Sequence, residues 1–323
     1  MKSIAIVCGG DSGEYEISVK SGNVVLQYLY PEKYKGYLIF ICGKDWYFIA
    51  DDGTKIPVDK NDFSITVSGT KITFDAVFNA IHGTPGEDGK LLGYFDMMQI
   101  PYTSCSMVTS AITFHKDYCK RIVKTYGVKV ADSVLLNSAH IPDIEEIIKT
   151  IGLPAFVKPN NGGSSVGVSK VKLIDEMLPA IEKAFLEDQE ILIERYIAGR
   201  EIACGVIESK GRMIVFPITE IISKKEFFDY EAKYTPGMSD EITPAEVDEK
   251  TDALIKKTGA YLYHRIGCKG FVRFDFILTP TELYFLEVNV VPGITAASIL
   301  PKQANCMNIS LEQLFDMALE NII

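Results

Sequence analysis

Two alternating segments near the C-terminal end constrain the fold of this chain more than any other feature. Residues 270–277 and 283–293 each alternate apolar and other side chains, and a Pro-containing break separates them. This period is typical of β-strands, and the break suits a hairpin turn. A turn centred near Thr281 would set Asp275 roughly opposite Glu287. The sequence therefore predicts a hairpin in which two carboxylates face each other across the strands.

The same register sets Arg273 roughly opposite Asn289, on the face that carries the two carboxylates. Clustered acids are costly in a sheet unless a cation neutralises them, and oxygen ligands suit a hard ion such as Mg²⁺. A guanidinium beside them could clamp phosphate oxygens. The patch therefore predicts a site for Mg²⁺ and a nucleotide phosphate. The alternative is a polar hairpin face that only meets water.

Composition places the chain among ordinary globular proteins of two or three domains. It has 323 residues, of which 47% are hydrophobic and 24% charged. A net charge of -10 argues against a general nucleic-acid surface. The seven cysteines are scattered and form no C-x-x-C pair, which favours reduced thiols in a cytoplasmic protein. We expect neither a targeting segment nor a membrane partner, because no apolar run approaches about 18 residues.

The order of apolar patterns predicts an α/β protein whose N-terminal part is an open, mostly parallel sheet covered by helices. The expected N-terminal strands are 4–8, 36–42 and 75–81, and the expected helices end near 28 and cover about 91–98. The expected later elements are a helix over about 110–126, strands at 155–158, 167–171, 190–197, 201–208 and 212–218, and helices near 175–185, 245–266 and from 310.

A Gly- and Ser-rich loop, residues 158–167, joins two of the predicted strands. Its glycines let backbone N–H groups approach a phosphate closely, and its hydroxyls add donors. Lys158 ends the preceding strand, where its ammonium could reach the same anion. The loop lacks the G-x-x-x-x-G-K-[ST] pattern and leads into a strand, so it is not a P-loop. An ordinary surface turn is the alternative.

The strand over 190–197 is followed closely by a further acid, Glu201. A strand edge offers backbone donors and acceptors for an adenine ring, and a carboxylate can bind ribose hydroxyls. The sequence thus indicates an adenosine-binding edge next to the phosphate loop. A plain surface acid is the alternative for Glu201.

Six short strings occur in a fixed order along the chain. They are 9–18 (GGDSGEYEIS), 80–89 (AIHGTPGEDG), 158–167 (KPNNGGSSVG), 228–234 (FDYEAKY), 273–275 (RFD) and 287–295 (EVNVVPGIT). In this order and spacing they resemble, essentially end to end, the D-alanine–D-alanine ligases of the ATP-grasp superfamily. The resemblance implies an N-terminal open sheet and two α+β domains that sandwich ATP. The implied domains are 1–104 (substrate-binding), 105–194 (central ATP-grasp) and 195–323 (catalytic ATP-grasp).

The resemblance also implies the reaction, in which two D-alanines are joined for peptidoglycan precursor synthesis. ATP phosphorylates the carboxylate of one D-alanine, the amine of the other attacks the acyl phosphate, and phosphate leaves. The implied co-substrate is ATP, and the implied metal is Mg²⁺ (two ions), which Mn²⁺ can replace. A cytoplasmic homodimer is also implied. Alternatives are a depsipeptide-forming D-alanine–D-lactate ligase, another ATP-grasp carboxylate–amine ligase and a non-catalytic nucleotide-binding protein.

Site roles are carried over from the family onto matching positions of this sequence. The catalytic and substrate-binding roles fall on Glu14, His82, Ser164, Tyr234, Arg273, Gly293, Ser298 and Ile299. The ATP-binding roles fall on Lys116, Lys158, Ser164, Ser165, Glu194, Arg195, Ile197, Glu201 and Lys233. The metal-binding roles fall on Asp275, Glu287 and Asn289, which we call the metal trio.

In this assignment Glu14 accepts the ammonium of the first D-alanine. Arg273 and the backbone N–H of Gly293 stabilise the oxyanion of the tetrahedral intermediate. Ser298 and the backbone of Ile299 receive the carboxylate of the second D-alanine. The resemblance thus implies that both ends of the chain contribute to the substrate site.

A polar segment, 223–240, is expected to act as a lid that excludes water from the acyl phosphate. The resemblance implies that Tyr234 and Ser164, linked through Glu14, help to hold it closed. Phe228 stands where many family members carry tyrosine, so any hydroxyl contact at that position is absent. Arg195 stands where lysine is common, a neutral change if its backbone is what meets adenine.

Overall fold

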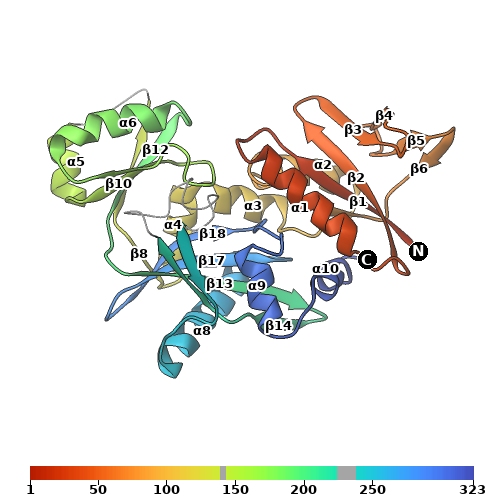
Figure 1. Ribbon diagram of the computed structural model, residues 1–323. Helices are drawn as coiled ribbons and strands as arrows, with labels where there is room; N and C mark the ends of the chain where they lie inside the picture. The colour runs from red at the N-terminus through yellow and green to blue at the C-terminus, as the bar shows by residue number, and fades with distance from the viewer. Residues whose placement is uncertain (139–142, 224–237) are drawn as a thin grey trace.

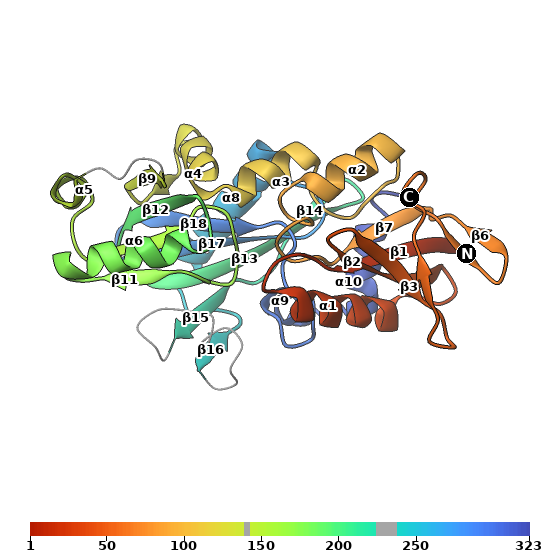
Figure 2. The ribbon, with the colours of Figure 1, turned by 90° about the horizontal axis from the view of Figure 1, so that it is seen from above.

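The computed structural model describes residues 1–138, 143–223 and 238–323. Figure 1 shows an N-terminal lobe and a central lobe, both set against a larger C-terminal sheet. Figure 2, seen from above, shows the same parts side by side, with both chain termini at the N-terminal lobe.

The N-terminal lobe is a five-stranded sheet with two helices and a small hairpin. Its elements are β1 (Lys2–Gly9), α1 (Tyr15–Tyr28), β2 (Tyr34–Cys42), β3 (Asp45–Ile49), β4 (Lys55–Pro57), β5 (Ile65–Val67), β6 (Thr70–Ile72), β7 (Ala76–Asn79) and α2 (Lys90–Met98). The sheet order is β4-β3-β2-β1-β7, and β1 pairs in parallel with both β2 and β7. Its central strand is fully buried from Ile4 to Cys8, as a continuous apolar run in a parallel sheet requires.

Strands β3 and β4 were not expected from the sequence and pair antiparallel at the sheet edge. Their side chains are exposed or half-buried, so they lack the strong apolar pattern that marked the inner strands. The parallel prediction is confirmed for β2, β1 and β7, and β3 and β4 add an antiparallel extension beside β2.

The central lobe contains a four-stranded antiparallel sheet of order β11-β10-β12-β9. The elements from this part of the chain are α3 (Met107–Phe114), α4 (Lys116–Thr125), β8 (Lys129–Val130), β9 (Ser133–Asn137), α5 (Ile144–Ile151), β10 (Ala155–Pro159), β11 (Ser169–Val171), the short 3₁₀ helix η1 (Ile174–Glu176), α6 (Met177–Phe185) and β12 (Glu190–Arg195). Helices α5 and α6 pack their apolar faces onto this sheet in one core.

The expected single helix over 110–126 is wrong, because it is two helices that break at His115. The His115 backbone is extended, with φ -83° and ψ 99°, and its side chain accepts a hydrogen bond from the N–H of Tyr118. His115 thereby caps α4. Apolar periodicity carries no signal for such a break, since both helices present buried side chains and both contact β18.

The C-terminal part forms a seven-stranded sheet whose main path is β16-β15-β13-β17-β18-β8, with β14 paired to β13. Its elements are β13 (Arg200–Ser209), β14 (Arg212–Val215), β15 (Thr219–Ser223), β16 (Ser239–Ile242), α8 (Glu249–Ile266), β17 (Val272–Leu278), β18 (Leu283–Asn289), α9 (Ile299–Asn305) and α10 (Leu311–Leu319). Helix α8 starts later than expected, because Asp248 caps it by accepting a hydrogen bond from the N–H of Thr251.

The predicted hairpin is confirmed as β17–β18. Asp275 pairs with Glu287 and Arg273 pairs with Asn289, as the alternation indicated. The register shifts between Asp275 and Phe276, so a β-bulge lies directly beside the metal trio. Bulges re-aim side chains next to functional sites, a feature that a strict period of two cannot reveal.

The last helix, α10, packs between the N-terminal lobe and strand β13 of the C-terminal sheet, and both contribute to one core. Phe315 of α10 contacts Phe78 of β7 edge-to-face, with ring centroids 5.5 Å apart. The hydroxyl of Tyr34 donates to the Asp316 carboxylate at 2.7 Å. A shared core therefore ties the two ends of the chain together.

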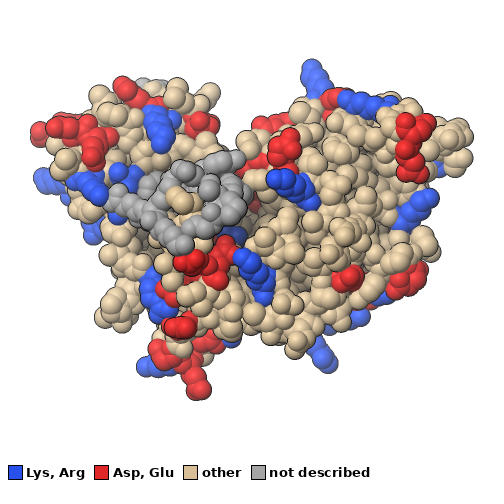
Figure 3. All heavy atoms as spheres, viewed as in Figure 1, with Lys and Arg blue, Asp and Glu red and all other residues tan. Residues whose placement is uncertain are grey.

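Charged side chains of both signs lie on the surface of the described residues (Figure 3). On the face shown in Figure 3, acidic and basic side chains are mixed among the described residues. Among the same residues, no helix combines the length and apolarity that a bilayer crossing needs.

Candidate active site

A cavity of about 400 Å³ lies between the four-stranded sheet and the C-terminal sheet. Strands β10 and β12 supply one wall, and β13, β15 and β18 supply the other. All the predicted ATP-binding residues that fall in the described part of the chain line it, namely Lys116, Lys158, Ser164, Ser165, Glu194, Arg195, Ile197 and Glu201. Glu287 of the metal trio lines it as well. Segments up to 171 residues apart in sequence number, from Lys116 to Glu287, thus meet at one cavity.

A buried carboxylate, Glu194, lies between two lysines at the edge of this cavity. Lys158 Nζ lies 3.2 Å from Glu194 Oε1, and Lys120 Nζ binds the other oxygen. Burial by itself would raise the pKa of Glu194, but the charges of Lys158 and Lys120 outweigh it and lower that pKa. Each carboxylate oxygen of Glu194 therefore binds a lysine, and the backbone groups of Glu194 are left to contact a nucleotide.

The Gly- and Ser-rich loop closes over the cavity and reaches the N-terminal lobe. Lys116 Nζ donates to the carbonyl of Gly162 at 2.6 Å. Ser164 donates its hydroxyl hydrogen to the Glu14 carboxylate. A Cβ on Gly163 would lie 2.6 Å from Glu14 Oε2, so a side chain there would displace the Glu14 carboxylate.

The backbone of this loop is strained at two serines. Ser164 has φ 51° and Ser165 has φ 58°, a left-handed conformation that few residues other than glycine adopt. Such strain costs about 1–3 kcal/mol and persists where the surrounding structure enforces it, often at functional sites. Here the contact between Ser164 and Glu14 provides part of that enforcement.

In the metal trio, Asp275 is buried and already holds nitrogen donors. Arg273 donates to its two carboxylate oxygens, with both distances 2.8 Å, and Asn289 Nδ2 donates to Asp275 Oδ2 at 3.0 Å. Burial disfavours the guanidinium charge, but the charge of Asp275 raises the pKa of Arg273 above its ordinary value. Arg273 therefore stays cationic beside any phosphate that enters.

The described residues contain no group of three or more His, Cys, Asp or Glu side chains suited to a metal ion. The metal trio instead offers two carboxylates and one carboxamide on paired strands. Mg²⁺ is commonly held by one or two carboxylates, with phosphate oxygens and water completing its shell. The donor set therefore fits Mg²⁺ in company with a nucleotide better than Mg²⁺ alone.

His82 is buried between the N-terminal helix α1 and the loop that follows the hairpin. Its Nε2 lies 3.0 Å from the hydroxyl of Ser21, and its Nδ1 lies 2.9 Å from the carbonyl of Val291. Since a carbonyl only accepts, Nδ1 carries the hydrogen. Burial lowers the pKa of His82, which favours the neutral ring. The contacts show an oriented, uncharged imidazole.

Gly293, Ser298 and Ile299 form a compact turn after β18. A Cβ on Gly293 would lie 2.9 Å from Ser298 Oγ, so these two residues are in contact. The hydroxyls of Ser298 and Thr295 lie 2.8 Å apart. Ile299 is buried and begins α9. The structure therefore brings the predicted second-substrate residues together beside the predicted oxyanion group.

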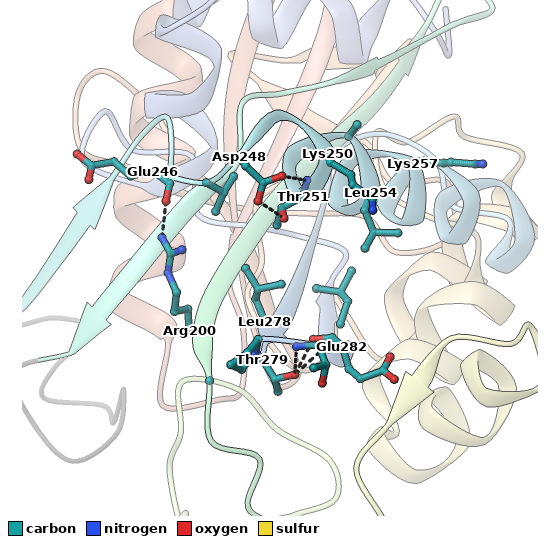
Figure 4. A pocket seen from close by; sticks show the side chains of 16 residues that line it. Arg200, Glu246, Asp248, Lys250, Thr251, Leu254, Lys257, Leu278, Thr279 and Glu282 are labelled. Carbon is teal, nitrogen blue, oxygen red and sulfur yellow. Dashed lines mark hydrogen bonds between the residues drawn. The ribbon is translucent and has the colours of Figure 1, made fainter.

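A second, more open hollow of about 1160 Å³ lies between the start of α8 and the β17–β18 turn (Figure 4). Arg200 donates to the carbonyl of Glu246 at its rim, and Asp248 caps α8 there. None of the described residues to which the sequence assigned a site role lines it. Its larger volume therefore does not make it the candidate site.

Comparisons with known proteins agree with this geometry. One family model, D-ala D-ala ligase N-terminus, matches residues 3–105, and another, D-ala D-ala ligase C-terminus, matches residues 122–320. The chain is 49% identical over 320 residues to a D-alanine–D-alanine ligase of Flavobacterium johnsoniae, covering 99% of each chain. The chain belongs to the D-alanine–D-alanine ligase family. It is therefore an ATP-grasp ligase, as the order of the six strings indicated.

Solved structures of this family share the fold along almost the whole chain. D-alanyl-alanine synthetase A of Vibrio cholerae matches with a TM-score of 0.89 and 27% identity, covering 99% of this chain and 98% of that one. The VanG D-Ala:D-Ser ligase of Enterococcus faecalis matches with a TM-score of 0.87 and 32% identity, covering 98% of each. Ligases that differ in their second amino acid thus share this architecture.

Two side chains at the ligase site were not singled out from the sequence. Lys120 lies four residues after Lys116, and this spacing on one helix face was the available signal. Glu87 belonged to a matched string but received no role; it reaches the backbone of Val291. Two assigned residues, Lys233 and Tyr234, lie outside the described residues, as does Phe228 and most of the expected lid.

Proposed function

We propose that this chain ligates two D-alanines into D-alanyl-D-alanine through an acyl phosphate made from ATP. The observation that carries the proposal is the meeting of the nucleotide-pocket lysines, the metal trio and the Glu14–Ser164 contact around one cavity. A carboxylate is a poor acyl donor until it is phosphorylated. A ligase must therefore hold phosphate-transferring groups and the acceptor carboxylate at one place, and this arrangement suits that need.

In the nucleotide pocket we assign Lys116 and Lys158 to the α and β phosphates. The backbone at the end of β12, residues 194–197, would meet adenine, and Glu201 would bind the ribose. Lys158 lines the cavity while it pairs with Glu194, which supports its place beside the phosphates. Lys233 is assigned to the transferring phosphate from the family resemblance.

The metal trio would hold Mg²⁺, or Mn²⁺ in its place, with two ions expected from the family. When bound, Mg²⁺ supplies charge neutralisation to the phosphate oxygens during phosphoryl transfer. The residues of the chain orient this arrangement, since the Arg273–Asp275 pair and the paired strands fix the donors before any ligand enters.

For the first D-alanine we assign the ammonium to Glu14, with His82 nearby. Arg273 and the Gly293 N–H would stabilise the oxyanion that forms when the second amine attacks. Ser298 and the backbone of Ile299 would receive the second carboxylate. The short distance between Gly293 and Ser298 supports this, because the two assigned roles require neighbouring residues.

We also propose the division into domains 1–104, 105–194 and 195–323, a cytoplasmic location and a homodimeric assembly. The seven cysteines are all free of disulfides, which suits a reducing compartment. A nucleic-acid partner is not expected, given the net charge of -10.

The central test is phosphate release from ATP and Mg²⁺ with D-alanine, compared with L-alanine, D-serine and D-lactate. We expect D-alanine alone to support rapid release and to yield dipeptide, with L-alanine at least about tenfold slower. Equal rates with D-alanine and D-lactate would support the depsipeptide alternative. Preference for mixed D-alanine and D-serine would place the chain with the D-Ala:D-Ser ligases, and no release with any of them would overturn the proposal.

A Glu287→Gln variant tests the metal trio. Loss of one carboxylate should lower the turnover rate by about 100-fold or more, because charge on the phosphates is no longer offset. Glu282→Gln, at the turn of the same hairpin and paired with exposed Lys129, is the matched control and should keep near-normal turnover. Normal turnover and Mg²⁺ dependence in Glu287→Gln would refute the assignment.

A further inference from the structure

The peptide of Val291, just before the predicted oxyanion group, is held on both sides by side chains from the N-terminal lobe. The Val291 N–H donates to Glu87 Oε1 at 3.2 Å, and His82 Nδ1–H donates to the Val291 carbonyl at 2.9 Å. One backbone residue of the C-terminal part thus has its donor and its acceptor satisfied by two side chains more than 200 residues earlier in the chain.

Glu87 is itself held in a closed loop. Its Oε2 accepts from the N–H of Gly83 at 2.6 Å, and its own N–H donates to the carbonyl of Gly83 at 2.8 Å. Asn79 Nδ2 donates to the Gly86 carbonyl at 2.9 Å. The loop that carries both His82 and Glu87 is therefore fixed before it meets Val291.

The conformation of this loop depends on a glycine at position 83. Gly83 has φ +71°, and a Cβ there would lie 2.7 Å from Ser12 Oγ. Ser12 occupies that space and donates its hydroxyl hydrogen to the carbonyl of His82 at 3.0 Å. The close approach of Ser12 thus adds a third hold on the loop from the start of α1.

Val291 is placed where its position matters for chemistry. It follows the last residue of the metal trio, Asn289, by two positions, and it precedes Gly293 by two. Pro292 lies between Val291 and Gly293 and restricts the backbone there. Fixing the Val291 peptide therefore restricts where the N–H of Gly293 points, and Gly293 packs against Ser298 on its other side.

We propose that Glu87, together with His82, is a positioning residue that holds the Val291 peptide so that the Gly293 N–H faces the developing oxyanion. This inference rests on the proposed ligase reaction and deepens it. Glu87 touches no reacting atom in this scheme and acts through the backbone. Because the oxyanion forms only when the second amine attacks, loss of the hold should slow that step more than the phosphorylation of the first D-alanine.

The test measures the two half-reactions separately in Glu87→Ala, Glu87→Gln and wild type. Positional isotope exchange in bridge-labelled ATP with D-alanine reports acyl phosphate formation, and chromatography reports dipeptide. In Glu87→Ala we expect dipeptide formation to fall by about 10-fold to 100-fold, with isotope exchange and the KM for ATP within about twofold of wild type. Glu87→Gln keeps one accepting oxygen, so its rate of dipeptide formation should lie between the rates of Glu87→Ala and wild type.

Asp88→Asn is the matched control, because Asp88 adjoins Glu87 but its carboxylate binds Thr84 and Lys90. It should retain both half-reactions. Parallel loss of exchange and dipeptide in folded Glu87→Ala, or unchanged dipeptide formation, would overturn the positioning role. If Glu87→Ala does not fold, the same criteria apply to Glu87→Gln. A wild-type chain that makes no dipeptide overturns the proposed function and this role together, whereas active wild type with unaffected variants overturns this role alone.

Discussion

Two glutamates at this site, Glu194 and Glu87, show how neighbours decide the behaviour of one residue type. Glu194 lies between Lys158 and Lys120, whose charges outweigh burial and lower its pKa. Within the part of the chain that the structure describes, the donors at the two Glu87 oxygens are backbone N–H groups. Burial, reinforced by the charge of Glu14, raises the pKa of Glu87 to about 8.

The difference matches what each region has to do. A phosphate pocket needs fixed cations, and a carboxylate shared between two lysines orients both of them. Glu87 instead accepts one backbone N–H at each oxygen, from Gly83 and from Val291, and these two partners are not cations. Sequence alone shows two glutamates, and only their surroundings separate them.

Of the variants that test this comparison, Lys120→Met should have the largest effect, because it breaks the buried ion pair between Lys120 and Glu194. We expect the free energy of unfolding to fall by about 3 kcal/mol, the lower end for a buried pair, since Lys158 still faces Glu194. Denaturant unfolding measures it, with Lys120→Arg retaining the charge and exposed Lys124→Met on the same helix as controls. A Lys120→Met protein as stable as wild type would mean that Lys158 alone satisfies Glu194.

Removing the other lysine should act on the ligand more than on the fold. Lys158→Ala takes a charged donor from the predicted phosphate contacts, which should weaken ATP binding by about 1.5–3 kcal/mol. Titration calorimetry with ATP and Mg²⁺ tests this, and Lys149→Ala on the exposed side of α5 serves as control. Unchanged affinity for ATP would place Lys158 outside the nucleotide site.

The smallest effect is the pH dependence that separates Glu87 from Glu194. The folded pKa of Glu87, about 8, exceeds its ordinary value of 4.5, so its contribution to stability is full below 4.5 and is lost as pH rises through about 8. Glu194 has a lowered pKa, so its contribution is present above its ordinary value and is lost as pH falls through its folded pKa.

Unfolding free energies of wild type and Glu87→Gln between about pH 5 and pH 9 would show the contribution of Glu87. We expect the advantage of wild type over the variant to shrink as pH rises. Neutral His82, whose pKa is lowered by burial, has the opposite trend at low pH in both proteins, and it therefore cancels in the difference. A wild-type advantage that is constant or grows with pH would show that Glu87 is ionised throughout.

Much of the site was predictable because it is encoded locally. The alternation along 270–293 determined which side chains share a face, and the observed pairing of Asp275 with Glu287 follows from it. Within the Gly- and Ser-rich loop, and likewise within the strand before Glu201, the hydrogen-bonding groups lie a few residues from each other along the chain. These features depend on residue type and on the alternation of side chains along a strand, and both can be read from the sequence.

Other features of the fold were not predicted, because no local pattern in the sequence reports them. The break at His115 and the β-bulge beside Asp275 interrupt a regular period, and the edge strands β3 and β4 carry too weak an apolar pattern to show one. The packing of α10 between the N-terminal lobe and β13 could not be read from the sequence either, since an apolar helix face does not specify what it covers.

The sequence by itself determined the family, the ligase fold, the hairpin register and the residues that gather around the cavity between the two sheets. Tertiary structure alone decided that Glu194 is shared by Lys120 and Lys158, and that Glu87 grips the Val291 peptide. The physical reason is that the charge and hydrogen-bonding state of a buried group depends on what surrounds it within a few ångströms, and folding brings those neighbours from remote parts of the chain.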